Sequence, residues 1–180
     1  MGERVFFCEQ IGHRWVLYGQ CSCGLEATHV YPADAEPGDY ESEWPGDPCA
    51  CGGRIELGSR IGRSVYRRQD GSVVNPNGEP LPVGAVYALA PPYGRAGPDG
   101  RYLVCVVHGE PHRHHWHIDG RASNCTRPED DAHRCWVRHG SPEQGTLHVD
   151  KAGDTCDAGA GSIQVPGWHG FLRRGELVEA

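Results

Sequence analysis

The sequence contains no long hydrophobic run. Nowhere do about 18 apolar residues follow one another, so we predict no membrane-spanning helix. The first residues also lack the apolar stretch of a signal peptide, and we therefore expect expression in the cytoplasm. No window of about eleven residues combines helical periodicity with freedom from glycine and proline, which argues against a mainly helical fold.

Basic residues are in the minority. The chain has 24 acidic and 17 basic residues, which gives a net charge of −7. An acidic protein gains no counterion-release attraction to a phosphate backbone, so we do not expect general nucleic-acid binding. A local basic patch remains an alternative to a solvated hairpin face at four arginines, namely Arg60, Arg63, Arg67 and Arg68.

Familiar catalytic motifs are also missing. The sequence has no P-loop, no GxGxxG, no GxSxG elbow, no HExxH and no papain-type cysteine context. We therefore expect a protein that is not an enzyme and has no small-molecule substrate. A metal-dependent hydrolase is the enzymatic alternative, for which Asp119, Asp130 and Asp131 are the candidate general bases.

What the sequence does contain is short β-like runs separated by hairpin dipeptides. Asp70-Gly71, Asn77-Gly78, Asp99-Gly100 and Asp119-Gly120 can supply the positive φ of tight turns. This pattern predicts a mainly β, antiparallel, loop-rich fold with few helices. The expected strands are Arg4–Cys8, Arg14–Tyr18, Arg54–Leu57, Ser64–Tyr66, Ser72–Val74, Ala85–Leu89, Tyr102–Val107, Cys135–Arg138, Thr146–Val149 and Gly170–Leu172.

The same pattern suggests three blocks along the chain. Residues 1–58 form a zinc-ribbon-like module that holds two cysteine pairs. Residues 59–100 form a connector with a hairpin at 64–74, and residues 101–180 form a β-rich Cys/His domain with a small antiparallel β core.

The nine cysteines point to metal because the chain carries no recognisable export signal. Cys21-Ser22-Cys23-Gly24 and Cys49-Ala50-Cys51-Gly52 are two similar turns, each able to present two thiolates to one ion. Four thiolates are a preferred ligand set of structural zinc, and the glycine suits a turn that needs positive φ. Redox or disulfide pairing and unrelated thiols are the alternatives.

A second, looser group of candidate ligands lies toward the C-terminus. Cys125, Cys135, Cys156 and His169 can form a Cys₃His zinc site, with His133 as a substitute ligand. Their separations are too irregular for a motif, so buried or free thiols and surface imidazoles remain the alternative. The histidines of the run 112–117 are expected to be exposed polar residues or a weak divalent-ion site, and Cys8 and Cys105 to be core residues.

Half of the chain resembles a known group of proteins. The segments that carry the resemblance are 116–126 (WHIDGRASNCT), 133–140 (HRCWVRHG), 149–156 (VDKAGDTC), 161–163 (GSI) and 168–172 (WHGFL). Over residues 95–178 the chain is similar to small Cys/His-rich proteins of actinobacterial bacteriophages whose activity is not characterised. The resemblance implies a phage origin and a C-terminal unit in which Cys125, Cys135, Cys156 and His169 act together.

Together these observations predict a non-enzymatic, zinc-stabilised phage protein. We expect it to be a virion structural or assembly accessory, associated with capsid or tail, that binds other phage proteins. One structural zinc ion is expected, with a second at the looser group. The expected location is the host cytoplasm during expression, with the virion as the second location. The alternatives are a phage effector that binds a host protein or nucleic acid through the ribbon, and the hydrolase.

Overall fold

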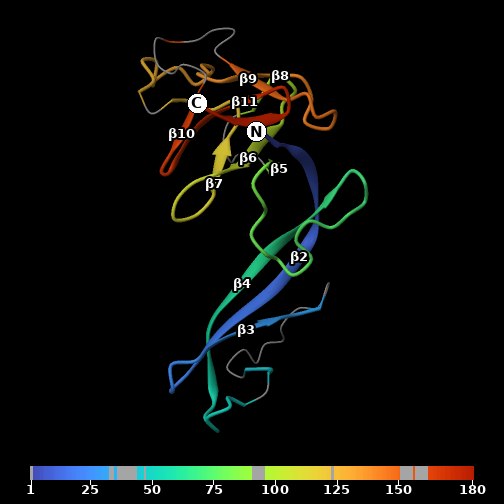
Figure 1. Ribbon diagram of the computed structural model, residues 1–180, viewed down its shortest axis with the longest axis vertical. Coiled ribbons are helices and arrows are strands. Elements are labelled where there is room, and N and C mark those ends of the chain that lie inside the picture. The colour runs from blue at the N-terminus through green and yellow to red at the C-terminus, as the bar shows by residue number, and fades with distance from the viewer. Residues whose placement is uncertain are drawn as a thin grey trace. The chain divides into compact units, whose positions relative to one another are not determined.

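The computed structural model describes residues 2–32, 35, 44–46, 48–90, 96–122, 124–150, 156 and 162–180. Within these ranges the chain forms strands and no helix, which confirms the predicted mainly β, loop-rich fold (Figure 1). None of these residues belongs to a helix that is long and apolar enough to cross a membrane. The strands are β1 (Glu3–Arg4), β2 (Phe6–Cys21), β3 (Glu26–Val30), β4 (Ile55–Arg68), β5 (Ala85–Leu89), β6 (Tyr102–Val107), β7 (His114–His117), β8 (Val137–His139), β9 (His148–Asp150), β10 (Ile163–Val165), β11 (Trp168–Arg173) and β12 (Glu176–Glu179).

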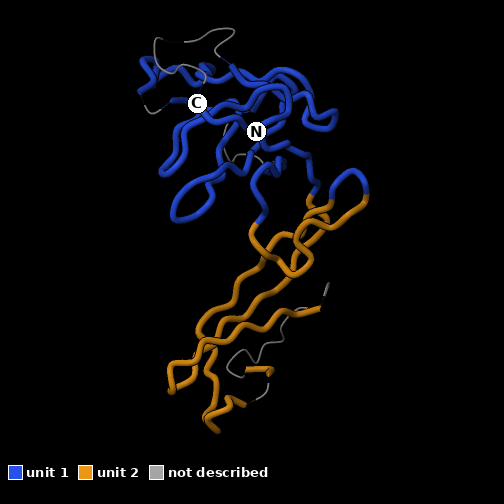
Figure 2. Tube along the Cα trace, viewed as in Figure 1, with its two compact units in different colours: residues 1–9, 68–70, 81–180 blue, residues 10–67, 71–80 orange. Residues whose placement is uncertain are grey.

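The chain divides into two compact units, which Figure 2 shows in different colours. Unit 1 comprises residues 1–9, 68–70 and 81–180, and unit 2 comprises residues 10–67 and 71–80. The three predicted blocks follow one another along the chain, whereas these units interleave. The predicted connector 59–100 is accordingly shared, because its first half belongs mainly to unit 2 and residues 81–100 belong to unit 1.

Unit 2 is built on two long strands, β2 and β4, which pair with each other. Each of these strands is longer than predicted. β2 includes the predicted run 14–18 together with residues on both sides, and β4 joins the predicted runs at 55–57 and 64–66 into one strand. Antiparallel β3, which the sequence did not indicate, adds to β2 with Leu17 opposite His29. The predicted strand at 72–74 contributes only a single bridge, between Arg67 and Val73.

Unit 1 contains three small groups of strands. Antiparallel β5, β6 and β7 form a meander, and Phe6 and Phe7 of β2 pair in parallel with β5. A second sheet has the order β1-β12-β11-β10, and β8 pairs with β9. The run Tyr102–Val107 is almost entirely apolar because β6 is buried on both faces.

The core of unit 1 lies around β6 and includes Cys105, and Cys8 is a second buried free thiol of this unit. Cys8 and Cys105 are 1% and 0% exposed, which confirms them as core residues. Burial raises the pKa of the Cys8 thiol to about 12 and also raises that of Cys105, so both stay protonated and apolar in character. The other core members include Leu103, Ile118, Trp136, Leu147, Ile163 and Leu172.

Candidate metal centres

The first centre is built from two turns of the same design. Cys21 ends β2, and the amide of Gly24 donates to the Cys21 carbonyl at 2.8 Å. The amide of Gly52 donates to the Cys49 carbonyl at the same distance. Gly24 and Gly52 have φ values of 88° and 80°, so both turns need a residue that tolerates the left-handed region. This agrees with the role predicted for these glycines.

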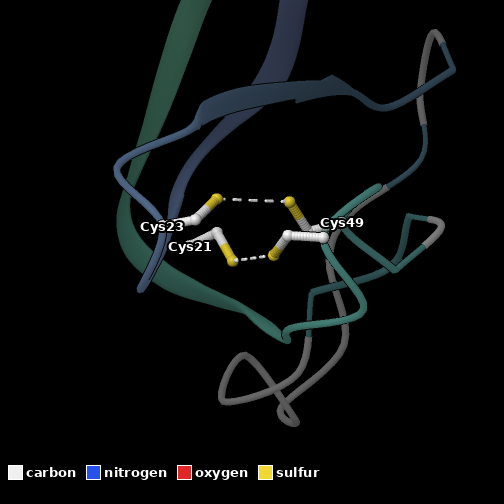
Figure 3. Close-up of side chains that lie close together, drawn as sticks. Cys21, Cys23 and Cys49 are labelled. Carbon is white, nitrogen blue, oxygen red and sulfur yellow. Dashed lines mark hydrogen bonds between the residues drawn. The ribbon is translucent and has the colours of Figure 1, made fainter.

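These turns bring together four thiols, Cys21, Cys23, Cys49 and Cys51, which we call the N-terminal cluster. All four sulfurs lie within 4.8 Å of one another, and all four cysteines are free thiols. Sγ of Cys21 lies 3.6 Å from that of Cys51, and Sγ of Cys23 lies 3.6 Å from that of Cys49. Figure 3 shows Cys21 and Cys23 on one turn directed toward the turn that carries Cys49. The cluster can therefore hold a metal ion, as predicted.

Backbone amides support the negative charge of these sulfurs. Gly53 N–H donates to Cys51 Sγ at 3.3 Å. A hydrogen bond from the Cys23 backbone amide, with help from the neighbouring thiols, lowers the pKa of Cys21 to about 7. A thiol with that pKa is partly ionised near neutral pH, and only the thiolate form is a metal ligand. Hydrogen bonds with the neighbouring thiols, led by Cys51, raise the pKa of Cys49 to about 12, so the four thiols share few negative charges until a cation binds.

Gly53 also makes room for the cluster. A methyl group at this position would lie 3.0 Å from Sγ of Cys21 and 3.1 Å from Sγ of Cys51. Cys21 and Cys49 are buried beside Ile55 and the half-buried Trp44, whereas Cys23 and Cys51 are exposed. The cluster thus replaces much of the apolar core at this end of unit 2.

The second centre lies within the core of unit 1. Cys125, His133, Cys135 and Cys156, which we call the C-terminal cluster, have ligand atoms within 4.8 Å of one another. Sγ of Cys135 lies 3.6 Å from Sγ of Cys156 and 3.5 Å from Nε2 of His133. Sγ of Cys156 lies 3.9 Å from Sγ of Cys125. His133 and Cys135 are each 1% exposed, so this cluster is more deeply buried than the first.

Loop hydrogen bonds position these ligands. The carboxylate of Asp130 accepts from the amides of Ala132 and His133 at 3.0 and 3.2 Å, which fixes the turn that leads into the cluster. The Cys135 amide donates to the Gly120 carbonyl at 3.0 Å. Burial raises the pKa of Cys135 to about 11, whereas the Arg127 amide donates to Cys125 Sγ at 3.4 Å.

The fourth residue whose ligand atom lies within 4.8 Å of the others is His133, the predicted substitute, and His169 does not belong to this group. His169 lies on β11, where it is exposed and its ring is 6.4 Å from that of Phe171. Its backbone carbonyl accepts from Ala180, so its position is set by the β11–β12 ladder. His133 comes two residues before Cys135, in the same loop, and the structure places it, rather than His169, beside the three cysteines.

The other candidates occupy different places. Asp119 is buried and ion-paired with Arg138, and the Asp131 side chain is fully exposed. The predicted histidine run forms β7 over 114–117, where His115 Nδ1 lies 2.7 Å from the hydroxyl of Tyr87. None of these groups belongs to either cluster.

Sequence and structure comparisons add no relative to this description. No protein-family model matches the chain, and neither a curated protein nor a solved structure resembles it at a significant level.

Proposed function

We propose that this chain is a non-enzymatic, zinc-stabilised bacteriophage protein that acts by binding other proteins. The observation that carries the proposal is the presence of two separate sets of four ligand atoms, one in each unit. Each set consists of soft sulfur donors, with one imidazole in the second. Such donor sets are typical of structural zinc sites.

The distances within the clusters suit zinc. Zinc binds thiolate sulfur at about 2.3 Å and imidazole nitrogen at about 2.0 Å in tetrahedral geometry. Two ligands of one tetrahedron are then about 3.8 Å apart for two sulfurs and about 3.5 Å apart for sulfur and nitrogen. The closest sulfur pairs lie at 3.6 Å and the His133–Cys135 pair at 3.5 Å. A disulfide would require about 2.05 Å, so the spacing favours a shared ion.

Four protein ligands favour a structural role over a catalytic one. A catalytic zinc keeps one position for water, and a four-coordinate ion held by either cluster has none to spare. Two of the candidate general bases make other contacts. Asp119 forms an ion pair with Arg138, and the carboxylate of Asp130 accepts a hydrogen bond from the His133 amide. Metal binding would instead add to the stability of two small units, because ligands of this kind come together only on folding.

The phage origin and the virion role rest on the resemblance of residues 95–178. Mass spectrometry of purified virions of the phage that encodes the chain tests this role. We expect peptides of the chain in intact particles at a fixed ratio to a capsid or tail protein. Particles that lack the chain, from cells that produce it, would exclude the virion role.

The metal assignment is tested by elemental mass spectrometry of the purified full chain. We expect two zinc ions in the wild type, and one in each of the double variants Cys23→Ser/Cys51→Ser and Cys125→Ser/Cys156→Ser. The buried Cys8 and Cys105 provide a matched control, since Cys8→Ala/Cys105→Ala should keep two ions. A wild type without zinc, or with iron in its place, contradicts the proposal.

A second candidate function has a specific observation in its favour. In unit 2 the guanidinium of Arg60 lies 4.1 Å from the ring centroid of Trp15, and Arg63 donates to the hydroxyl of Tyr18 at 3.3 Å. Alternating arginine and aromatic side chains are a common platform for single-stranded nucleic acid. These two pairs lie on opposite faces of the β2–β4 pair, because residues three apart on a strand point to opposite sides. An effector that binds host nucleic acid would use one or both of these pairs. Fluorescence anisotropy with a labelled single-stranded DNA tests it, with Arg60→Gln/Arg63→Gln as the variant.

A further inference from the structure

Two sheet edges in unit 1 line the same cavity. Among the strands that the structure describes, β7 is the last of its sheet and β10 is the last of the other large sheet (Figure 1). A cavity of about 470 Å³ is lined by all four residues of β7 and by Ser162, Gln164 and Val165 at β10. Volumes of this size are common for ligand sites. An unpaired strand edge presents backbone donors and acceptors that another strand can use.

The backbone groups of Gln164 are directed away from β11. The amide of Ala180 donates to the carbonyl of His169, so the backbone groups of His169 are directed toward β12. Gln164 is the register partner of His169 on the other side of β11. Such a pair exchanges no hydrogen bonds in an antiparallel ladder, and the amide and carbonyl of Gln164 therefore point outward from the sheet.

The same reasoning applies to β7. The amide of Ile118 donates to the carbonyl of Leu103, so its backbone groups are directed toward β6. Backbone direction alternates along a strand, which leaves those of His117 and His115 directed away from β6. Both strands thus carry outward-directed backbone groups at residues that line the same cavity.

The side chains around the cavity give it a chemical character. Among the described residues that line it, none carries a carboxylate, although the chain has 24 acidic residues. Arg121 and three histidines of β7 line it instead. The guanidinium of Arg121 also donates to the carbonyls of Pro128 and His133 and lies 4.0 Å from the exposed Asp131. Trp116 and Trp136 add an apolar surface, with ring centroids 5.9 Å apart in an edge-to-face arrangement. The cavity therefore suits an occupant that is extended, partly apolar and negatively charged.

We propose that an extended segment of a partner protein, carrying acidic side chains, binds in this cavity as an added strand hydrogen-bonded to Gln164. The proposal rests on the proposed function of protein binding and names the partner's chemistry. An extended peptide offers alternating N–H and C=O groups that match a strand edge, and addition of a strand to a sheet is a recurrent mode of peptide recognition. Its carboxylates would face Arg121 and the β7 histidines.

A displayed library of random ten-residue peptides is the first experiment. Selection on the full, zinc-loaded chain should enrich peptides that contain Asp or Glu alternating with apolar residues and that lack proline in the centre. Enriched peptides are then synthesised with a fluorophore and titrated by anisotropy. Absence of any enrichment for acidic sequences overturns the proposal.

Variants at Gln164 test the mode of binding. Gln164→Pro removes the outward amide without removing a ladder donor, and Gln164→Ala keeps the amide as its matched control. We expect the proline variant to lose about tenfold or more in affinity, because a buried carbonyl of the peptide then has no donor. The alanine variant should stay close to the wild type. Equal affinities of the two variants overturn strand addition at β10.

A charge series covers the case in which Gln164→Pro does not fold. Gln164 is exposed, so Gln164→Lys and Gln164→Glu leave the core intact. The lysine variant should bind acidic peptides more tightly than the wild type, and the glutamate variant more weakly. Affinities that do not follow this order overturn the site. If the chain binds two zinc ions and its affinity for the peptide is the same in every Gln164 variant, the proposed function stands and this cavity is rejected as the binding site.

Discussion

The guanidinium of Arg138 lies 2.7 Å from the carboxylate of Asp119, and the two side chains are only 4% and 1% exposed. Burial raises the pKa of Asp119 despite the nearby cation, so removal of the carboxylate from water outweighs the attraction. Such a pair adds little net stability, but removal of one partner leaves an uncompensated buried charge. We expect Arg138→Met to lower the free energy of unfolding by about 3–5 kcal/mol, as measured by urea denaturation.

The double variant Asp119→Asn/Arg138→Met tests whether the lost stability comes from the unpaired buried charge. It should recover a substantial part of the loss, because neither charge remains buried. Arg4→Met is the matched control, since Arg4 pairs with Glu176 at 3.8 Å and is 84% exposed. That surface pair should contribute about 0–1 kcal/mol. A double variant less stable than Arg138→Met alone would contradict this account.

His133 and His169 give a sharp test of the C-terminal cluster. His133→Ala removes a ligand with Nε2 3.5 Å from Cys135 Sγ, and it should reduce bound zinc from two ions to one at limiting metal. His169→Ala alters an exposed side chain on β11 and should keep both ions. Elemental mass spectrometry after dialysis measures the difference. Loss of zinc only in His169→Ala would restore the original assignment.

Gly53 and Gly52 form a second matched pair. Gly53→Ala places a methyl group 3.0 Å from Cys21 Sγ, and sulfurs held by a metal cannot move aside. We expect this variant to weaken zinc binding at the N-terminal cluster by about tenfold or more in a competition titration with a chelator. Gly52→Ala meets no atom within 4 Å but strains a φ of 80°, so it should lower stability by about 1 kcal/mol. Equal zinc affinities in the two variants would contradict the prediction.

The pH dependence of stability follows from Glu143. Its carboxylate pairs with Arg101 and accepts from Ser141 Oγ at 2.6 Å, and these bonds hold its pKa at about 2. An unfolded glutamate has a pKa of about 4.3, so the folded state binds its proton less tightly. The resulting stability is present above about pH 4 and is lost as the pH falls toward 2.

Paired unfolding curves measure this contribution. The difference in free energy of unfolding between wild type and Glu143→Gln should be largest at pH 6–7 and shrink below about pH 4. Release of metal in acid affects both proteins alike and cancels in the difference. Glu129→Gln, at an exposed glutamate, is the control and should show no such trend. A difference that grows on acidification has the wrong sign.

The N-terminal cluster was predictable because its geometry is local. Each turn is a four-residue segment with two cysteines and a final glycine, and this pattern is visible directly in the sequence. The C-terminal cluster is assembled from separate loops, and its fourth ligand depends on how those loops pack. A signal was nevertheless present, since His133-Arg134-Cys135 repeats the one-residue spacing of the N-terminal turns.

The fold class was predictable, whereas the bounds of most strands were not. Short apolar runs identified β5 and β6 with their observed bounds. Gly12 lies inside β2, so a single long strand, which pairs with the long β4, looks like two separate runs in the sequence. Asn75 was also missed: it is buried, and its side chain bonds Tyr66, Ser64 and Glu79 within the 64–79 loop. Contacts of this kind depend on tertiary packing that a loop-like Asn-Pro-Asn-Gly sequence does not reveal.

The paired turns of the N-terminal cluster bear on how quickly unit 2 can fold. Each turn is closed by its own backbone hydrogen bond and carries two sulfurs. One turn can therefore act as a bidentate ligand before the other turn is in place. Turns of this length form in well under about a microsecond, whereas bringing the two together closes a much longer loop. Under the proposed metal binding, an ion bound first by one turn would be completed by the other, and the rate of assembly would depend on the concentration of free metal. Supply of the ion in the cell would set the pace at which this end of the protein matures.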